Sequence, residues 1–81
     1  MVFPQVLMNV TVKSKPAISD ITGLPQAIAD VEKQLGDTGR VLIRYSGTQP
    51  MCRVMVEAAS NDEATRYCKQ LADIIQTQLG I

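Results

Sequence analysis

The stretch RYSGTQP, residues 44–50, places an arginine, two hydroxyl side chains and a glycine in one short break between two apolar runs. The guanidinium of Arg44 is a planar fork that suits two oxygens of a phosphate group. The hydroxyls of Ser46 and Thr48 can donate hydrogen bonds. Gly47 between them can adopt a positive φ and lets a ligand approach the backbone, whose consecutive N–H groups can form an anion-binding nest. Together these groups predict a site for a small dianion, such as a sugar phosphate or inorganic phosphate.

A second arginine, Arg53, follows this loop, and its role depends on how the flanking strands pair. Directly opposite Arg44 it would share a face of the sheet, and therefore the anion, with that residue. A register shifted by one residue would place it on the other face. The loop is also compatible with a hairpin turn that binds nothing, because Ser, Thr, Gly and Pro are common in turns. Arg44 would then pair with an acidic residue such as Glu57, and Tyr45 would serve packing.

The composition limits what else the chain can do. Its 81 residues are enough for a single domain, residues 1–81. Eight basic and eight acidic side chains give zero formal net charge, which argues against partners such as nucleic acid or an anionic membrane surface. The sequence has no histidine, so it lacks the commonest general base and metal ligand. A chain this short without histidine would carry at most part of a catalytic site.

The two cysteines, Cys52 and Cys68, are too few for a disulfide framework or a zinc site. Both fall on apolar stripes, so we expect buried, reduced thiols. No run approaches the roughly 18 apolar residues that span a bilayer, and no signal peptide is visible. The sequence therefore predicts a cytoplasmic protein.

Hydrophobic periodicity predicts five elements, which the chain's glycines, prolines and capping residues delimit. Alternating residues favour a strand, and Pro4 near its start indicates either an edge strand or the beginning of a strand. A four-three-four spacing of apolar residues predicts a helix that Gly36 ends, and Ser60 and Glu63 form a capping box at the start of a second helix that ends at Gly80. The predicted elements are a strand in 3–13, a helix over 24–35, strands over 40–45 and 51–59, and a helix over 61–79.

The order of these elements, β-α-β-β-α, predicts a two-layer α+β domain with both helices on one face of an antiparallel sheet. The strand over 40–45 is apolar on both faces in its middle, which favours a central position in the sheet. The face away from the helices would carry Asn9, Thr11 and, depending on the strand register, an arginine. That face must meet either water or a partner.

Residues 39–58, GRVLIRYSGTQPMCRVMVEA, closely resemble the C-terminal domain of the α-D-phosphohexomutases, whose pattern is roughly G-R-V-L-x-R-x-S-G-T-E-P-x-x-R-V-M-V-E. The opening FPQVLMNVTVK also resembles the entry into that domain, so the resemblance covers nearly the whole chain. Family members that act on mannose or glucose phosphates usually carry Asn at the position of Gly47, which favours the glucosamine branch. Gln49 departs from the usual Glu and leaves open what that Glu pairs with.

The resemblance implies a four-domain parent enzyme that interconverts glucosamine 6-phosphate and glucosamine 1-phosphate, in amino-sugar and cell-wall precursor synthesis. The reaction would pass through a phosphoserine and a 1,6-bisphosphate intermediate. Mg²⁺ and the phosphoserine would lie in other domains, so this chain would bind no metal or cofactor and contain no catalytic residue. Its fold would resemble that of the TATA-binding protein without the DNA function. By motif match, the residues that bind the substrate phosphate would be Arg44, Ser46, Gly47, Thr48 and Arg53.

The expected partners are therefore the sugar phosphate and the other three domains of the parent mutase, and the chain alone is expected to be inactive. Two alternatives stay open: the same domain from a phosphomannomutase or phosphoglucomutase, and a stand-alone module that senses a phosphorylated metabolite. The gene context distinguishes the last, because a mutase domain must be preceded by a catalytic serine loop and an aspartate-rich metal loop.

Overall fold

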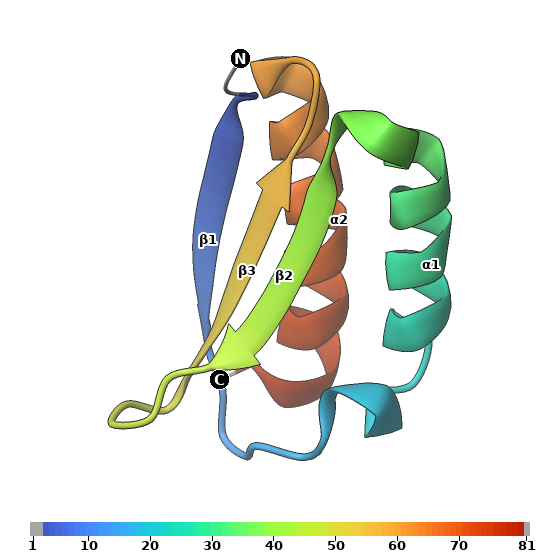
Figure 1. Cartoon of the computed structure of the whole chain (residues 1–81). Coiled ribbons are helices and arrows are strands. Elements are labelled where there is room, and N and C mark those ends of the chain that lie inside the picture. Colours follow the sequence, from blue (N-terminus) through green and yellow to red (C-terminus); the bar gives the residue numbers. More distant parts are fainter. Residues whose placement is uncertain (1–2, 81) are drawn as a thin grey trace.

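A computed structural model describes residues 3–80 and shows three antiparallel strands with two helices packed on one face (Figure 1). This is the predicted α+β fold with the predicted element order. Two short 3₁₀ turns, Ile18–Asp20 and Gly36–Thr38, flank the first helix. The elements are β1 (Gln5–Thr11), α1 (Leu24–Leu35), β2 (Arg40–Tyr45), β3 (Met51–Glu57) and α2 (Asn61–Leu79).

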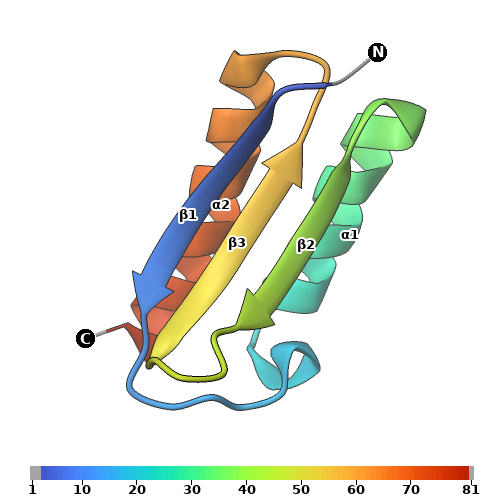
Figure 2. The same cartoon turned by 60° about the vertical axis from the view of Figure 1, so that its left-hand side comes forward.

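The strand order is β1-β3-β2, so β3 is central and both of its neighbours are edge strands (Figure 2). The predicted central position of β2 is therefore wrong, whereas β1 is an edge strand, one of the two possibilities that Pro4 indicated. The prediction failed because Leu42 made both faces of β2 look apolar. In the structure Leu42 lies on the face away from the helices and is 50% exposed.

The core lies between the sheet and the helices. The inward face of β3 is fully buried at Cys52, Val54 and Val56. Both helices turn one apolar stripe toward it, as their spacing predicts. In α1, Ala27 is buried and Ile28 is only partly buried, so the stripe is rotated slightly from the predicted one. The buried helix residues are Leu24, Ala27, Val31 and Leu35 in α1 and Ala64, Cys68, Leu71, Ala72, Ile75 and Leu79 in α2.

Local signals set the ends of both helices. Gly23, with φ of 83°, precedes α1, and Gly36, with φ of 56°, follows it. These left-handed conformations suit glycine because it has no Cβ. At the start of α2, the Ser60 hydroxyl oxygen accepts a hydrogen bond from the Glu63 N–H at 3.2 Å. The Ser60 half of the predicted capping box and both predicted helix ranges are confirmed.

Both cysteines are free and buried, as predicted. The Cys68 thiol lies 3.4 Å from the Val54 carbonyl oxygen, which accepts its weak hydrogen bond. Burial raises the pKa of both thiols, so they stay protonated at neutral pH. Among the helices of residues 3–80, none is long and apolar enough to cross a membrane.

Gly39 is a position at which the fold leaves no room for a side chain. It is fully extended, with φ of −173°, so conformation alone would allow any residue. A Cβ at this position would overlap the Glu57 carbonyl oxygen of the neighbouring strand. We expect Gly39→Ala to lower the free energy of unfolding by roughly 1–3 kcal/mol, the usual cost of forced overpacking.

Urea unfolding measures this effect, and Gly47→Ala is the matched control. A Cβ on Gly47 would meet no atom within 4 Å. Gly47→Ala should therefore unfold like the wild type, and equal stability of the two variants would contradict the argument.

Candidate functional site

The loop that joins β2 to β3 projects from one end of the sheet (Figure 1). Its neck is closed by the Ser46 N–H, which donates to the Met51 carbonyl oxygen at 2.8 Å. The Ser46 hydroxyl oxygen accepts long hydrogen bonds from the N–H groups of Thr48, at 3.4 Å, and Gln49, at 3.3 Å. Ser46 thus folds the loop on itself, while its own O–H remains able to donate to a ligand.

Gly47 behaves differently from its predicted role. In residues 3–80 the positive-φ glycines are Gly23 and Gly36, so the loop is built without a left-handed residue at Gly47. What Gly47 contributes is open space, because nothing lies within 4 Å of where its Cβ would be. A ligand can therefore approach its backbone closely, which is the second part of the prediction.

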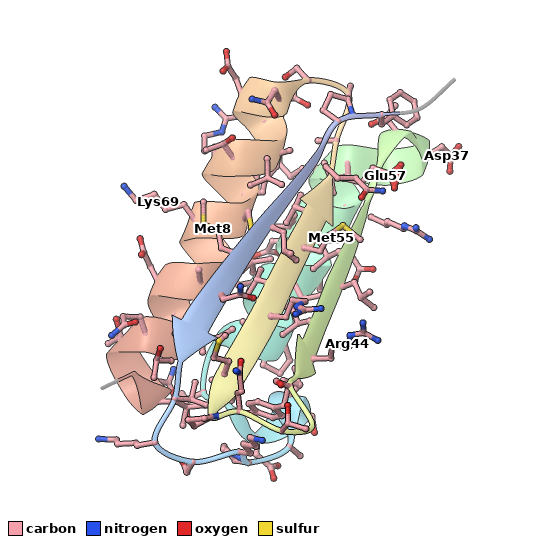
Figure 3. The ribbon with its side chains drawn as sticks, turned by 90° about the vertical axis from the view of Figure 1, so that its left-hand side faces the viewer. Met8, Asp37, Arg44, Met55, Glu57 and Lys69 are labelled. Carbon is pink, nitrogen blue, oxygen red and sulfur yellow. The ribbon has the colours of Figure 1, made fainter. Side chains whose placement is uncertain are left out.

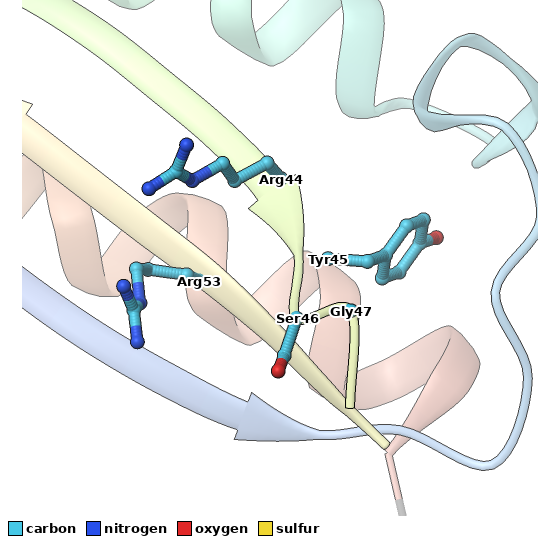
Figure 4. Close-up of a pocket in the computed structure, with 5 residues that line it drawn as sticks. All are labelled: Arg44, Tyr45, Ser46, Gly47 and Arg53. Carbon is cyan, nitrogen blue, oxygen red and sulfur yellow. The ribbon is translucent and has the colours of Figure 1, made fainter. Parts of the chain in front are cut away.

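The strand register answers the question that the sequence left open for Arg53. Arg44 of β2 pairs directly with Arg53 of β3, so both side chains lie on the open face of the sheet (Figure 4). On that face Arg53 also lies opposite Asn9 of β1. Both arginines are exposed. Two cations side by side favour an anion between them, because it would relieve their mutual repulsion.

The alternative partner for Arg44 is already taken. Glu57, at the other end of β3, pairs with Arg40, with 3.1 Å between Nε and Oε2. This is the ion pair found within residues 3–80. Figure 3 shows Glu57 and Arg44 well apart along the sheet face that lies away from the helices. The interpretation in which Arg44 pairs with Glu57 is therefore wrong.

A hollow of about 270 Å³ lies between the arginines and the loop (Figure 4). This volume is just below the usual range for small-molecule sites and suits a group the size of a phosphate. Four of the five predicted residues line the hollow, and Thr48 does not. The lining residues are Arg44, Tyr45, Ser46, Gly47 and Arg53.

Tyr45 is the lining residue that sequence reasoning left undecided. Its ring packs against the core, and its hydroxyl donates to the Pro16 carbonyl oxygen at 2.6 Å. Burial, with a smaller contribution from the neighbouring Cys52, raises the pKa of Tyr45. The phenol therefore stays protonated and keeps this hydrogen bond well into alkaline solution.

Lys15 is a further residue at the loop that the sequence did not point to. Its ammonium donates to the Ser46 carbonyl oxygen at 2.7 Å. Lys15 precedes Ser46 by 31 positions, in the connection between β1 and α1. No local sequence motif indicates this contact, because the two residues come together only in the folded chain.

The chemistry available at this site is binding. It presents guanidinium groups, a hydroxyl and backbone N–H groups, all of which donate hydrogen bonds to oxygen anions. Within residues 3–80, no three His, Cys, Asp or Glu side chains gather where a metal ion could be held. The lining residues include no carboxylate or imidazole that could act as a general base.

The arginine pair should cost the fold stability in the absence of an anion. Like charges directly opposite in a sheet are unfavourable. We expect Arg44→Gln to raise the free energy of unfolding by roughly 0.2–1 kcal/mol at low ionic strength, and added salt should shrink this gain. Arg40→Gln is the matched control on the same strand and face. It removes the ion pair with Glu57 and should lower stability by at most about 1 kcal/mol. A loss of stability in Arg44→Gln, measured by urea unfolding, would show that Arg44 has a stabilising partner.

Curated relatives match nearly the whole chain. The phosphoglucosamine mutase of Syntrophobacter fumaroxidans is 57% identical over 79 residues, which are 98% of this chain and 18% of that protein. The phosphoglucosamine mutase of Clavibacter sepedonicus is 48% identical over 80 residues, again 18% of its length. The chain thus spans less than a fifth of the relatives that it matches.

Solved structures with the same fold include the N-acetylphosphoglucosamine mutase of Aspergillus fumigatus. Its complex with glucose 1,6-bisphosphate superposes with a TM-score of 0.77 at 26% identity, over 98% of this chain and 16% of that one. Its complex with GlcNAc-6P and magnesium gives a TM-score of 0.74 at 27% identity, over 93% of this chain and 16% of that one. The sequence model of the phosphoglucomutase/phosphomannomutase C-terminal domain matches residues 7–74, and the chain belongs to that family.

Proposed function

We propose that this chain is the C-terminal domain of a phosphoglucosamine mutase and binds the substrate phosphate that is not being transferred. The observation that carries the proposal is the pairing of Arg44 with Arg53 beside the loop of Ser46 and Gly47. Two facing cations with no acidic partner among residues 3–80 favour an anion ligand. The relatives supply the substrate class. The curated relatives are phosphoglucosamine mutases, and the Aspergillus structures hold GlcNAc-6P or glucose 1,6-bisphosphate.

The remaining parts of the reaction belong to the rest of a longer protein. The chain covers only 18% of the phosphoglucosamine mutases of Syntrophobacter fumaroxidans and Syntrophus aciditrophicus. The acid, base and nucleophile of a phosphoryl transfer would come from the other domains, which would also hold the phosphoserine and the Mg²⁺. The partners of this domain would be those domains and the sugar phosphate. Two buried, unpaired cysteines suit a reducing compartment such as the cytoplasm.

Recognition of the phosphate group alone explains how one site can serve both halves of a mutase reaction. The 1,6-bisphosphate must rotate by about half a turn between the two steps, so that first one phosphate and then the other occupies this site. Arg44 can bond two phosphate oxygens, and Arg53, the Ser46 O–H and the Gly47 N–H can bond others. These groups bind the phosphate and make no demand on which sugar carbon carries it. Each charge-assisted hydrogen bond contributes about 1.5–3 kcal/mol.

Thr48 differs in its position from the other four predicted phosphate ligands. It does not line the hollow, and its N–H is directed to the Ser46 hydroxyl oxygen. Its hydroxyl would reach a ligand only if the loop adjusts on binding. Binding of phosphate by Thr48 therefore stays a prediction that follows from the motif.

A phosphoglucomutase or phosphomannomutase is the second candidate, because the matching family is described by those activities. Gly47 favours glucosamine phosphate, and so do the names of two curated relatives, both phosphoglucosamine mutases. Turnover of glucosamine 6-phosphate against mannose and glucose phosphates by the full-length enzyme would separate the two.

Titration of the chain with inorganic phosphate, followed by amide NMR, tests binding directly. We expect shifts confined to residues 44–53, with a dissociation constant in the millimolar range because no sugar contacts assist. Arg44→Ala should weaken binding about tenfold or more, since it removes charge-assisted hydrogen bonds. Arg40→Ala, on the same strand and face, should bind like the wild type. An absence of shifts up to tens of millimolar phosphate would contradict the proposal.

Kinetics of a full-length phosphoglucosamine mutase that carries this domain tests the role in the reaction. Arg44→Ala should raise KM and lower kcat together, because a misplaced phosphate loses both binding and near-attack geometry. A loss of kcat/KM of roughly 10²-fold is expected for such a misplacement. The 81-residue chain alone should show no turnover. Unchanged kinetics in the variant, or turnover by the chain alone, would each refute part of the proposal.

A further inference from the structure

The connection between β1 and α1 supports both ends of the β2–β3 loop. At the exit of the loop, the Val12 N–H donates to the Pro50 carbonyl oxygen at 2.7 Å. At its entry, the Lys15 ammonium donates to the Ser46 carbonyl oxygen at 2.7 Å. The Tyr45 hydroxyl donates back to the Pro16 carbonyl oxygen at 2.6 Å. We call residues 12–16 the support segment.

The support segment is itself held firmly. Val12 is fully buried and forms an isolated bridge with Gly80. The Lys13 N–H donates to the Leu79 carbonyl oxygen at 2.8 Å, at the end of α2. The segment thus connects the loop to the helix layer and can fix the loop relative to the core.

Lys15 acts on one particular peptide group. The carbonyl that it holds, on Ser46, belongs to the same planar trans peptide as the N–H of Gly47, and the two groups point in opposite directions. When Lys15 fixes the carbonyl, it therefore directs the Gly47 N–H away from itself. Gly47 lines the hollow between the arginines. A cation on the carbonyl oxygen also polarises the peptide and makes its N–H a stronger donor.

We propose that Lys15 is a positioning residue of the phosphate site, which orients and polarises the Ser46–Gly47 peptide for the anion. This inference rests on the proposed function. Lys15 need not touch the phosphate, and its effect passes through the Gly47 N–H. Its ammonium also adds a positive charge at the Ser46 carbonyl group of the loop.

A purely stabilising role fits Lys15 less well. The hydrogen bond to Ser46 is exposed. An exposed contact of a long side chain adds little to the free energy of unfolding, because ordering the side chain costs rotamer entropy. Loss of Lys15 should therefore barely change unfolding. A change in ligand affinity at constant stability would separate positioning from stability.

The test compares Lys15→Met, Lys15→Arg and the control Lys69→Met by phosphate titration of the 81-residue chain. Lys69 lies on the outer side of α2, away from the loop (Figure 3), so Lys69→Met removes one positive charge without touching the support segment. Lys15→Met should raise the dissociation constant for inorganic phosphate roughly three- to tenfold, the effect of one hydrogen bond. It should also shift the Gly47 amide proton upfield before any ligand is added. Lys15→Arg, which keeps the charge and a donor, should stay within about twofold of the wild type.

The outcomes separate this inference from the proposed function. If the wild type binds no phosphate, the proposed function fails, and this inference fails with it. If the wild type binds and Lys15→Met binds equally well, only the role of Lys15 is refuted. An equal loss in Lys69→Met would show that net charge, not position, governs binding, and would also refute the role of Lys15.

Discussion

β3 pairs with both other strands, and this double pairing decides where every side chain of the sheet points. Val54 lies opposite Met8 on one side and Ile43 on the other, and these residues face the helices. The next residues along the strand must then face away, because successive side chains alternate. A slip of β2 by one residue would bury Arg44 and expose Ile43. Burial of the apolar face therefore enforces the arginine pair on the other face.

This constraint shows why an unfavourable pair can persist. The core side chains of β3 are completely buried, and their burial is the larger contribution to the free energy of folding. The repulsion between Arg44 and Arg53 is small beside it. The domain can thus keep two facing cations ready for a ligand, at a cost that the rest of the sheet tolerates. Ligand sites are often places where local interactions conflict with stability in this way.

The open face is organised in rows that run across the three strands. Gln5, Glu57 and Arg40 form a row with the ion pair. Asn9, Arg53 and Arg44 form the row beside the loop. Between them lies an apolar row of Leu7, Met55 and Leu42, in which Leu7 and Leu42 are about half exposed. Each row consists of residues that lie directly opposite one another in the strand register, so polar and apolar rows alternate along the face.

Much of the fold could be predicted because its signals are local. Gly36 and the Ser60 cap specify helix ends within a few residues, and both helix ranges agree with the structure. The candidate site was also visible in part, since Arg44, Ser46 and Gly47 are adjacent in sequence. The order of the strands was not predictable in the same way. Leu42 fits a central strand that is buried on both faces, but it fits equally well an edge strand with an exposed apolar residue. The role of Lys15 was not predictable from local sequence, because its contact with Ser46 exists only after β1, α1 and β2 have assembled.

The bridge between Val12 and Gly80 has a consequence for how the domain is made. It joins the end of the first strand to the residue that follows the last helix. A ribosome delivers the β2–β3 loop well before it delivers Leu79 and Gly80. The loop therefore emerges while its underlying segment still lacks its anchor, and that segment can be secured only after α2 has left the exit tunnel. The part of the domain that we assign to ligand binding is then among the last to mature during translation, even though its residues lie in the middle of the chain.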